Sequence, residues 1–260
     1  MSEISEVRVC IVTGYGINAD YELETAFHLA GGEVARVHIR DLIENPNSLL
    51  KYHILAFPGG FSFGDHLGSG LVFAAMFKRN LREELESFLT EGKLIIGICN
   101  GFQVLVKMGV LPNMRGDWKP EVSLIHNEKG VFENSWVRIK AISTCKCIWT
   151  KGIDELEMPI RNGEGRFIAE SGQTLDNLER KELIALTYSG PNPNGSQNDV
   201  AGISDTTGRI LGLMPHPEAN IFREQHPTWT RRRQNTTVEG AGLGILRNGV
   251  SYARERLCQK

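Results

Sequence analysis

The stretch Leu94–Gln103, LIIGICNGFQ, decides how this chain is expected to fold. It opens with the run Leu94–Ile98, which is apolar throughout, as expected for a parallel strand covered on both faces. Apolar residues at helical spacing follow over Asn100–Met108. Cys99 stands between the two, in a Gly-x-Cys-x-Gly sequence. This order predicts the strand–turn–helix elbow that presents a nucleophile, here a cysteine.

Each residue type in this elbow has a physical reason. Gly97 and Gly101 remove Cβ atoms that would collide with the strand and the helix, and the sharp turn forces strained dihedrals on Cys99. Free N–H groups and the dipole at a helix N-terminus stabilise a thiolate. The N–H of Asn100 is predicted to point toward the oxygen of an attacked amide. The alternative is a buried cysteine in a core turn, and downstream residues favour the nucleophile.

A candidate acid–base pair lies in Met214–Glu218, MPHPE, after a predicted strand. Each proline pushes the residue before it into an extended conformation, so His216 and Glu218 project to the same side. Glu218 can then fix the tautomer of His216, which can take the Cys99 proton and later donate it to a leaving group. A surface turn that happens to contain histidine is the weaker interpretation. We therefore predict Cys99, His216 and Glu218 as catalytic residues.

The glycine-rich segment Pro58–Asp65, PGGFSFGD, follows the predicted strand His53–Phe57. A glycine pair at the end of a parallel strand lets backbone N–H groups approach a ligand closely. We predict the N–H of Gly60 as a second donor to the developing oxyanion. The alternative is a simple strand-to-helix turn.

Strand and helix signals alternate over the first half of the chain and predict an α/β fold with a doubly wound, mostly parallel sheet flanked by helices. The other predicted strands are Val7–Val12, Val34–Ile39, Trp136–Ile142, Leu183–Tyr188, Val200–Ser204 and Arg209–Met214. The other predicted helices run from Asn18 or Asp20 to Gly31, over Leu81–Leu89 and over Gly242–Leu257. A turn-rich stretch, Ser189–Asp199, lies between two strands. No boundary divides residues 1–260, which we interpret as a single domain.

Composition excludes several classes of protein. The chain is 41% hydrophobic and 23% charged with a formal net charge of -2, so charge alone predicts neither a nucleic-acid nor a membrane partner. No apolar run approaches the roughly 20 residues that span a bilayer, and the acidic start favours the cytoplasm. The five scattered cysteines do not form a disulfide framework. Cys145 and Cys147 lack a second pair at zinc-site spacing, so we expect no metal site.

Taken together, these motifs resemble the class I (triad) glutamine amidotransferases, whose fold is flavodoxin-like. The likeness is closer to the glutaminase subunits of phosphoribosylformylglycinamidine synthase, the PurQ type. It includes Gly163–Phe167, GEGRF, and Asn192–Ser196, NPNGS, and runs from about residue 7 to 255. The Asn-Gly-Phe-Gln sequence after the nucleophile is more specific to this type than the triad is.

This resemblance implies a set of roles. Cys99, His216 and Glu218 would form the triad through a thioester intermediate, Gly60 and Asn100 would supply oxyanion N–H groups, and Gln103 would lie beside the substrate glutamine. The ammonia would go to a synthetase subunit that makes formylglycinamidine ribonucleotide for purine biosynthesis, in a complex with a small accessory subunit. ATP and Mg would be bound by the synthetase, and this chain would hold no cofactor.

The chain departs from the family pattern in two places. Ala219 stands where the family usually has Arg, and Asn162 stands where it often has His. Neither position is in the triad, but both could alter contacts with the synthetase. The basic run Arg231–Arg233 is interpreted as a solvated loop face, with partner docking as the functional alternative.

Other functions compete with this interpretation. Gly14–Ala19 fits the dinucleotide-binding pattern G-x-G-x-x-A, and Asp41 follows the second strand. A nucleotide-binding protein of that kind would give Cys99 and His216 no role. A subunit that retains the fold without catalysis is a further alternative, as is a class I glutaminase serving another ATP-dependent synthetase.

Overall fold

The computed structural model describes residues 6–231 and 238–258. Its strands are β1 Arg8–Thr13, β2 Glu33–His38, β3 Ile54–Phe57, β4 Leu94–Ile98, β5 Val122–Ile125, β6 Glu133–Ala141, β7 Glu155–Asn162, β8 Arg166–Ala169, β9 Ile184–Tyr188, β10 Val200–Ser204 and β11 Ile210–Leu213. Its α-helices are α1 Asp20–Leu29, α2 Ile39–Glu44, α3 Leu71–Thr90, α4 Asn100–Met108, α5 Gly172–Arg180 and α6 Leu243–Arg256.

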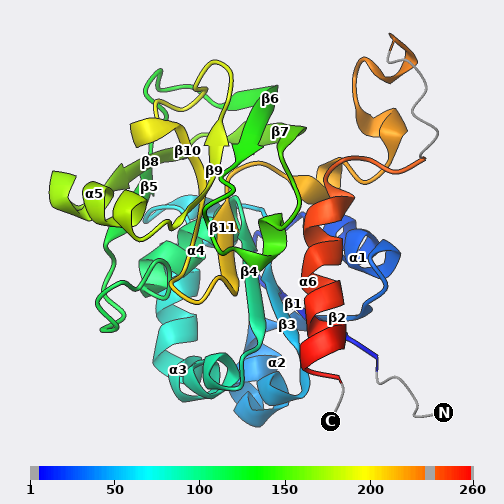
Figure 1. Cartoon of the computed structure of the whole chain (residues 1–260). Coiled ribbons are helices and arrows are strands. Elements are labelled where there is room, and N and C mark those ends of the chain that lie inside the picture. Colours follow the sequence, from blue (N-terminus) through cyan, green and yellow to red (C-terminus); the bar gives the residue numbers. More distant parts are fainter. Residues whose placement is uncertain (1–5, 232–237, 259–260) are drawn as a thin grey trace.

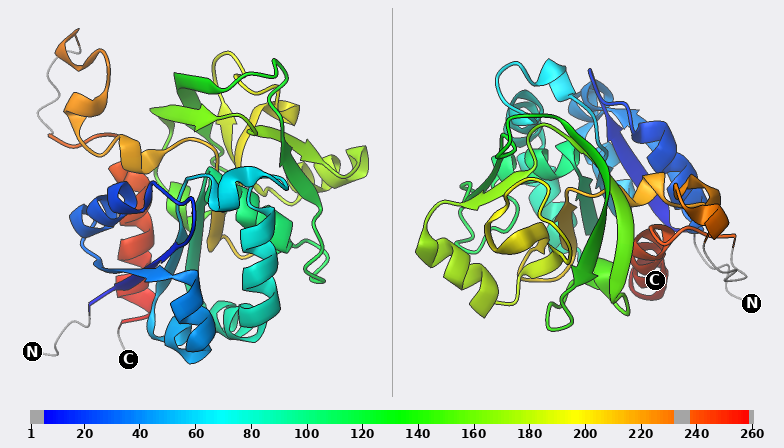
Figure 2. Two further views of the ribbon diagram at one scale, coloured as in Figure 1. Left: turned by 180° about the vertical axis from the view of Figure 1, so that it is seen from behind. Right: turned by 90° about the horizontal axis from the view of Figure 1, so that it is seen from above.

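Within the described residues, nine strands form one sheet in the order β2-β1-β3-β4-β11-β10-β9-β6-β7, while β5 and β8 pair separately. The strands from β2 to β11 run parallel to one another, and those from β10 to β7 pair antiparallel. Helices α1 and α6 pack together on one face, and α3 packs with α4 on the other (Figures 1 and 2). The predicted α/β class, a sheet flanked by helices, is confirmed.

The parallel half of the sheet gathers the predicted motifs at one edge. Strands β3 and β4 are buried at every residue, as their continuous apolar sequences predict. The carboxyl ends of β1, β3, β4 and β11 lie at the same edge because these strands are parallel. The turn after β1, the glycine-rich loop, the elbow and the His216 segment therefore meet there, where open α/β sheets bind ligands.

Strand β7 is the last strand of the antiparallel half of the sheet, and it also contributes to the edge where the motifs meet. Pro159 lies inside β7, which proline tolerates because β7 is an edge strand. The N–H of His216 donates to the carbonyl of Pro159 at 2.9 Å. This bond ties the candidate acid–base segment to β7 and places the end of β7, at Arg161, beside it.

Agreement between predicted and observed elements is closest where the motifs lie. The predicted bounds of β4, α4 and β10 are those observed. Helix α3 begins at Leu71 rather than Leu81, and α2, α5, β5, β7 and β8 were not predicted. The predicted cap of the first helix was wrong. Ala19 is the N-cap, and the Asp20 carboxylate instead accepts from Arg36 at 3.0 Å.

Candidate active site

Cys99 occupies the elbow in a strained backbone conformation. Its φ is 51° and its ψ is -105°, between β4 and α4. The Cys99 N–H donates to the carbonyl of Leu213 at 2.8 Å, which fixes the turn to β11. A Cβ on Gly97 would lie 2.7 Å from the Gly101 carbonyl, and one on Gly101 would overlap the Phe57 carbonyl. The predicted need for glycine on both sides of the cysteine is therefore confirmed.

His216 and Glu218 form a buried pair. Their exposed fractions are 3% and 0%. His216 Nδ1 and Glu218 Oε1 are 2.6 Å apart, so Nδ1 carries a proton and donates it to the carboxylate. His216 Nε2 is buried and has no hydrogen-bond partner among the described residues. His216 and Cys99 line the same cavity, so Nε2 is the ring atom left for proton exchange there.

Opposing effects set the charge of His216. Burial lowers its pKa, but interactions of the charged ring with Glu218 and Cys99 outweigh burial and raise the pKa to about 10. The folded protein therefore favours the imidazolium form at neutral pH. A positive charge beside a cysteine is the environment in which cysteine nucleophiles are activated.

The two predicted oxyanion donors both remain available. Gly60 lines the cavity, and its N–H bonds to no acceptor among the described residues. Its φ is 151°, and a Cβ on Gly60 would lie 2.8 Å from the Gly16 carbonyl, so a side chain is excluded there. Asn100 is the first residue of α4, so its N–H has no partner within the helix. Gly60 therefore lines the same cavity as Cys99, and Asn100 directly follows Cys99 in the chain.

The side chains of Asn100 and Gln103 belong to a buried hydrogen-bond network. The Asn100 amide donates to Gln103 Oε1 at 2.9 Å and accepts from the N–H of Ser62 at 3.3 Å. The Gln103 amide donates to the Glu164 carbonyl at 2.6 Å. Gln103 is 3% exposed and does not line the cavity that holds Cys99. This network ties the elbow helix to the glycine-rich loop and to the segment after β7. The expected contact of Gln103 with glutamine stays a prediction.

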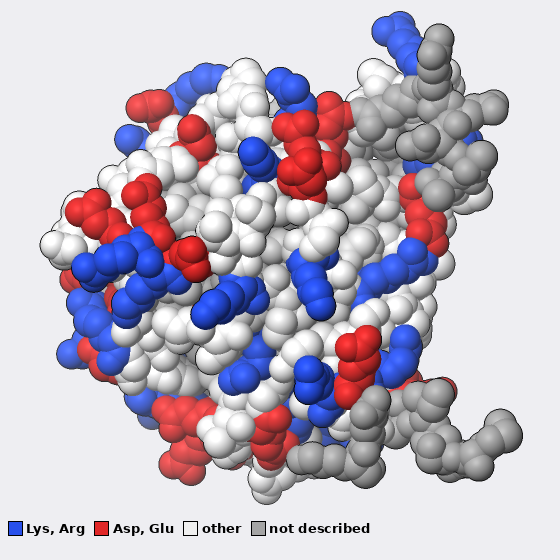
Figure 3. Space-filling view, in the orientation of Figure 1, with Lys and Arg blue, Asp and Glu red and all other residues white. Residues whose placement is uncertain are grey.

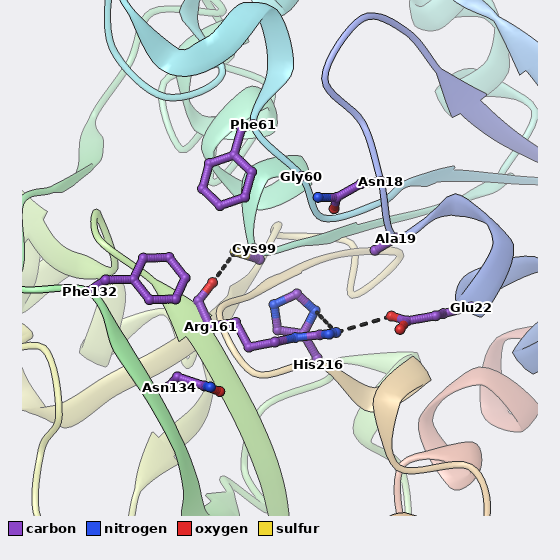
Figure 4. Close-up of a pocket in the computed structure, with 10 residues that line it drawn as sticks. All are labelled: Asn18, Ala19, Glu22, Gly60, Phe61, Cys99, Phe132, Asn134, Arg161 and His216. Atoms are coloured by element: carbon purple, nitrogen blue, oxygen red, sulfur yellow. Dashed lines mark hydrogen bonds and ion pairs between the residues drawn. The ribbon is translucent and has the colours of Figure 1, made fainter.

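A cavity of about 300 Å³ opens at Cys99, and Figure 4 shows the residues that line it. Its size lies at the lower end of the range for small-molecule sites. Phe61 and Phe132 face each other across one side, with ring centroids 6.3 Å apart. They are 45% and 52% exposed. A small substrate can therefore reach Cys99 between these rings and the opposite wall.

That opposite wall contains a charged pair that sequence reasoning did not single out. Arg161 on β7 and Glu22 on α1 form an ion pair, with Nη2 and Oε2 3.1 Å apart. The Arg161 side chain extends past the ring of His216 (Figure 4), and the Arg161 carbonyl lies 3.7 Å from Cys99 Sγ. The sequence offered one indication of Glu22. This residue follows the turn after the first strand, and turns at the carboxyl ends of parallel strands bind ligands.

The nucleotide-binding alternative does not suit the structure. The N–H of Phe61 donates to the Gly16 carbonyl at 2.8 Å, and a Cβ on Gly16 would overlap the Phe61 carbonyl. The glycine-rich loop thus occupies the space over the turn that a dinucleotide phosphate would need. Asp41 lies inside α2 rather than at the end of β2. The glycine at position 16 is explained by close packing of two loops.

The departures from the family pattern lie close to the site. Asn162 is 3% exposed, and both polar atoms of its side chain lack partners among the described residues. Ala219 is half-buried in the 3-10 turn Pro217–Ala219. Of the basic run, Arg231 is exposed, and positions 232 and 233 lie outside the described residues. Acidic and basic side chains intermingle on the face shown in Figure 3.

Disulfides, membrane-spanning helices and metal clusters were not expected from the sequence. All five cysteines are free thiols, as predicted. None of the helices in the described part of the chain has the length and apolar character to cross a bilayer. In that same part, no cluster of three or more His, Cys, Asp or Glu side chains could hold a metal ion.

Comparisons with known proteins agree with this geometry. Residues 6–253 match the family described as a CobB/CobQ-like glutamine amidotransferase domain. The chain is 40% identical over 258 residues to the phosphoribosylformylglycinamidine synthase subunit PurQ of Dehalococcoides mccartyi, covering 97% of this chain and 100% of the relative. It is 38% identical over 265 residues to the PurQ subunit of Methanococcus maripaludis, covering 94% and 97%.

Solved structures are similar as well. A chain of the structure of PurLQS from Thermotoga maritima superposes with a TM-score of 0.72 at 26% identity, covering 95% of this chain and 99% of that one. A glutamine amidotransferase from Thermotoga maritima has a TM-score of 0.56 at 16% identity, covering 96% and 98%, and supports the fold alone.

Proposed function

This chain belongs to the CobB/CobQ-like glutamine amidotransferases, among the PurQ subunits of phosphoribosylformylglycinamidine synthase, and we infer its function from that membership. We propose that it hydrolyses glutamine to glutamate and ammonia at Cys99. The observation that carries this proposal is the strained Cys99 elbow opening into one cavity with His216, which is paired to buried Glu218.

The first half of the reaction forms a thioester. Cys99 Sγ attacks the side-chain amide carbon of glutamine, and the N–H groups of Gly60 and Asn100 stabilise the oxygen as it becomes negative. His216 Nε2 holds the proton taken from Cys99 and gives it to the amide nitrogen, so the C–N bond breaks and ammonia leaves. Glu218 holds the ring in place and stabilises its positive charge throughout.

The second half releases glutamate. A water molecule gives a proton to His216 and attacks the thioester carbon. The C–S bond breaks, glutamate leaves, and Cys99 is regenerated. The same two N–H groups serve both tetrahedral intermediates because the carbonyl oxygen occupies the same position in each.

The ammonia would go to a synthetase subunit that converts formylglycinamide ribonucleotide to formylglycinamidine ribonucleotide in purine biosynthesis. The relative solved as PurLQS supports a complex of three kinds of subunit, with this chain in the place of PurQ. ATP and Mg would be bound by the synthetase, and the complex would work in the cytoplasm. Glutamine is the substrate of this chain.

The acceptor is tested by following nitrogen from glutamine. The chain is mixed with the synthetase and small subunits of the same organism, formylglycinamide ribonucleotide, Mg-ATP and glutamine labelled with nitrogen-15 in its amide. We expect the label in formylglycinamidine ribonucleotide. Glutamine hydrolysis without transfer to this acceptor would instead support a glutaminase that serves another ATP-dependent synthetase.

A further inference from the structure

The cavity at Cys99 holds two fully charged side chains besides the triad members, and both lie on one wall. Among the described residues that line it outside the triad, only Glu22 and Arg161 have acidic or basic side chains. They are half-exposed, at 47% and 36%, and they pair at 3.1 Å. Glu22 comes from α1 and Arg161 from β7, which lie in different halves of the fold. The two side chains meet at the wall of the cavity.

Glutamine matches this arrangement at its other end. Its amide must reach Cys99, and its α-carbon carries one carboxylate and one ammonium group side by side. We propose that Arg161 binds the α-carboxylate and Glu22 binds the α-ammonium group, so that this pair selects a free amino acid as substrate. The inference rests on the function proposed above. A planar guanidinium binds a carboxylate through paired hydrogen bonds, which a lysine could not reproduce.

Two observations favour substrate binding over a structural role for the pair. A half-exposed ion pair contributes little to stability because water screens it, so its charges can turn to a ligand at small cost. Arg161 Nη2 also lies 3.5 Å from His216 Nδ1, but Nδ1 already donates to Glu218 and a guanidinium has no acceptor. Arg161 therefore does not hold the imidazole by a hydrogen bond.

The test compares two electrophiles that react with Cys99. The diazoketone 6-diazo-5-oxo-L-norleucine carries the α-carboxylate and α-ammonium groups of glutamine, whereas iodoacetamide carries neither. In Arg161→Met, we expect labelling of Cys99 by the diazoketone to slow about ten- to hundredfold, the value of a charge-assisted bond. Labelling by iodoacetamide, followed by mass spectrometry, should keep its rate within about twofold.

Protection experiments separate the two charges. Glutamine and glutaramate, which lacks the α-ammonium group, are compared for their ability to slow iodoacetamide labelling of Cys99. In Glu22→Gln, glutamine should lose most of its advantage over glutaramate in protecting Cys99 from iodoacetamide. In Arg161→Met, both compounds should protect Cys99 less well. Matched controls are Glu24→Gln, another carboxylate of α1, which pairs with Arg36 of β2, and Arg138→Met, an exposed position on β6. Neither control residue lines the cavity, so neither should change protection or labelling.

Different failures have different meanings. If Arg161→Met slowed both electrophiles equally, Arg161 would act on Cys99 or His216, and the proposed contact with substrate would be wrong. An unchanged diazoketone rate in Arg161→Met, or an unchanged preference for glutamine over glutaramate in Glu22→Gln, would also overturn it. If the unsubstituted chain, bound to its synthetase, reacted with iodoacetamide but never with the diazoketone, the glutaminase function itself would fail, and this inference with it.

Discussion

Cys99 is held in a backbone conformation that L-amino acids rarely adopt, with φ at 51°. Such strain costs about 1–3 kcal/mol and persists only where surrounding structure enforces it. Here the enforcement comes from the bond to the Leu213 carbonyl and from glycines that allow β4 and α4 to meet closely. The strain aims the sulfur into the cavity instead of the core, which is what a nucleophile requires.

His216 and Glu218 should not be equally costly to replace. His216→Ala removes the group that moves protons, a step worth about 10²–10⁴ in rate. Glu218→Gln leaves that group present and weakens only its orientation and charge, so we expect a smaller loss. Steady-state glutamine hydrolysis by the folded variants measures both. Equal losses, or the reverse order, would contradict this division of roles.

The same pair predicts how stability depends on pH. Burial lowers the pKa of His216, but Glu218 and Cys99 favour its charged form more strongly, so the pKa rises from 6.5 to about 10 in the folded protein. The stabilisation from this pair is therefore fully present below pH 6.5 and is lost as pH rises toward about 10. The difference in unfolding free energy between the unsubstituted chain and Glu218→Gln, from urea denaturation, should shrink over that interval. A difference that stays constant or grows would show that the pair is not ionised as described.

The placement of individual residues at the cavity was predictable where a motif fixed the local backbone. Cys99, His216 and Glu218 each stand in a short segment whose glycines or prolines dictate the local backbone. Arg161 and Glu22 have no such local signature, since only the tertiary fold brings β7 and α1 close enough for the two side chains to pair at 3.1 Å. Gln103 shows the opposite limit. Its place on α4 was predicted, but burial and its bond to Glu164 use its amide within the protein.

At the scale of elements, the elbow depends on how closely β3 and α4 approach. A methyl group on Gly101 would overlap the carbonyl of Phe57 in β3. We expect Gly101→Ala to lower the unfolding free energy by about 1–3 kcal/mol, the usual cost of overpacking a core. Urea denaturation measures the change.

A second glycine gives the matched control. Gly244 lies in α6, and a Cβ added to it would have nothing within 4 Å. Gly244→Ala should be neutral or stabilise by about 0.5–1 kcal/mol through helix propensity. If both substitutions had the same effect, close approach at Gly101 would not be what the sequence protects.

The bounds of an element were predicted well when an apolar run was flanked by residues that end a strand or a helix. Strand β4 is apolar and bounded by Lys93 and the elbow, and its bounds were predicted to the residue. Strand β7 was missed because Pro159 argues against a strand, and only its place at the sheet edge makes proline acceptable. Helix α3 was predicted too short because its N-cap is Gly70, a residue in the left-handed conformation that offers no side-chain cap. Such a start carries no capping signature.

At the scale of the whole molecule, the site joins segments from both halves of the fold. The glycine-rich loop that carries Gly60 is anchored to the turn after β1 through the N–H of Phe61, which donates to the Gly16 carbonyl at 2.8 Å. From Ser62 to Ser69 the loop is joined to the elbow helix and to the segment after β7 by longer bonds. The N–H of Ser62 donates to Asn100 at 3.3 Å, and that of Ser69 donates to Glu164 at 3.4 Å. Residues Phe63, Gly64, Gly68 and Gly70 in this loop all have positive φ. A partner that contacts this loop could therefore shift the Gly60 donor.

From this arrangement we predict that the isolated chain is a poor glutaminase and that its synthetase activates it. An ungated glutaminase would release ammonia to water, whereas partner contact could complete the oxyanion hole only when ammonia can be used. Steady-state glutamine hydrolysis is measured with and without the synthetase loaded with nucleotide and acceptor. Equal kcat/KM in both conditions would refute gating and leave the triad assignment intact.

The central claim is that Cys99 is the nucleophile that releases ammonia from glutamine for a separate synthetase site. The direct measurement is product formation by the complex containing Cys99→Ala, with either glutamine or ammonium chloride as nitrogen donor. The variant is first shown by circular dichroism to be folded. We predict that glutamine no longer supports product formation, while ammonia supports it at the rate of the unsubstituted complex. Full glutamine-dependent activity in the folded Cys99→Ala complex would contradict the claim.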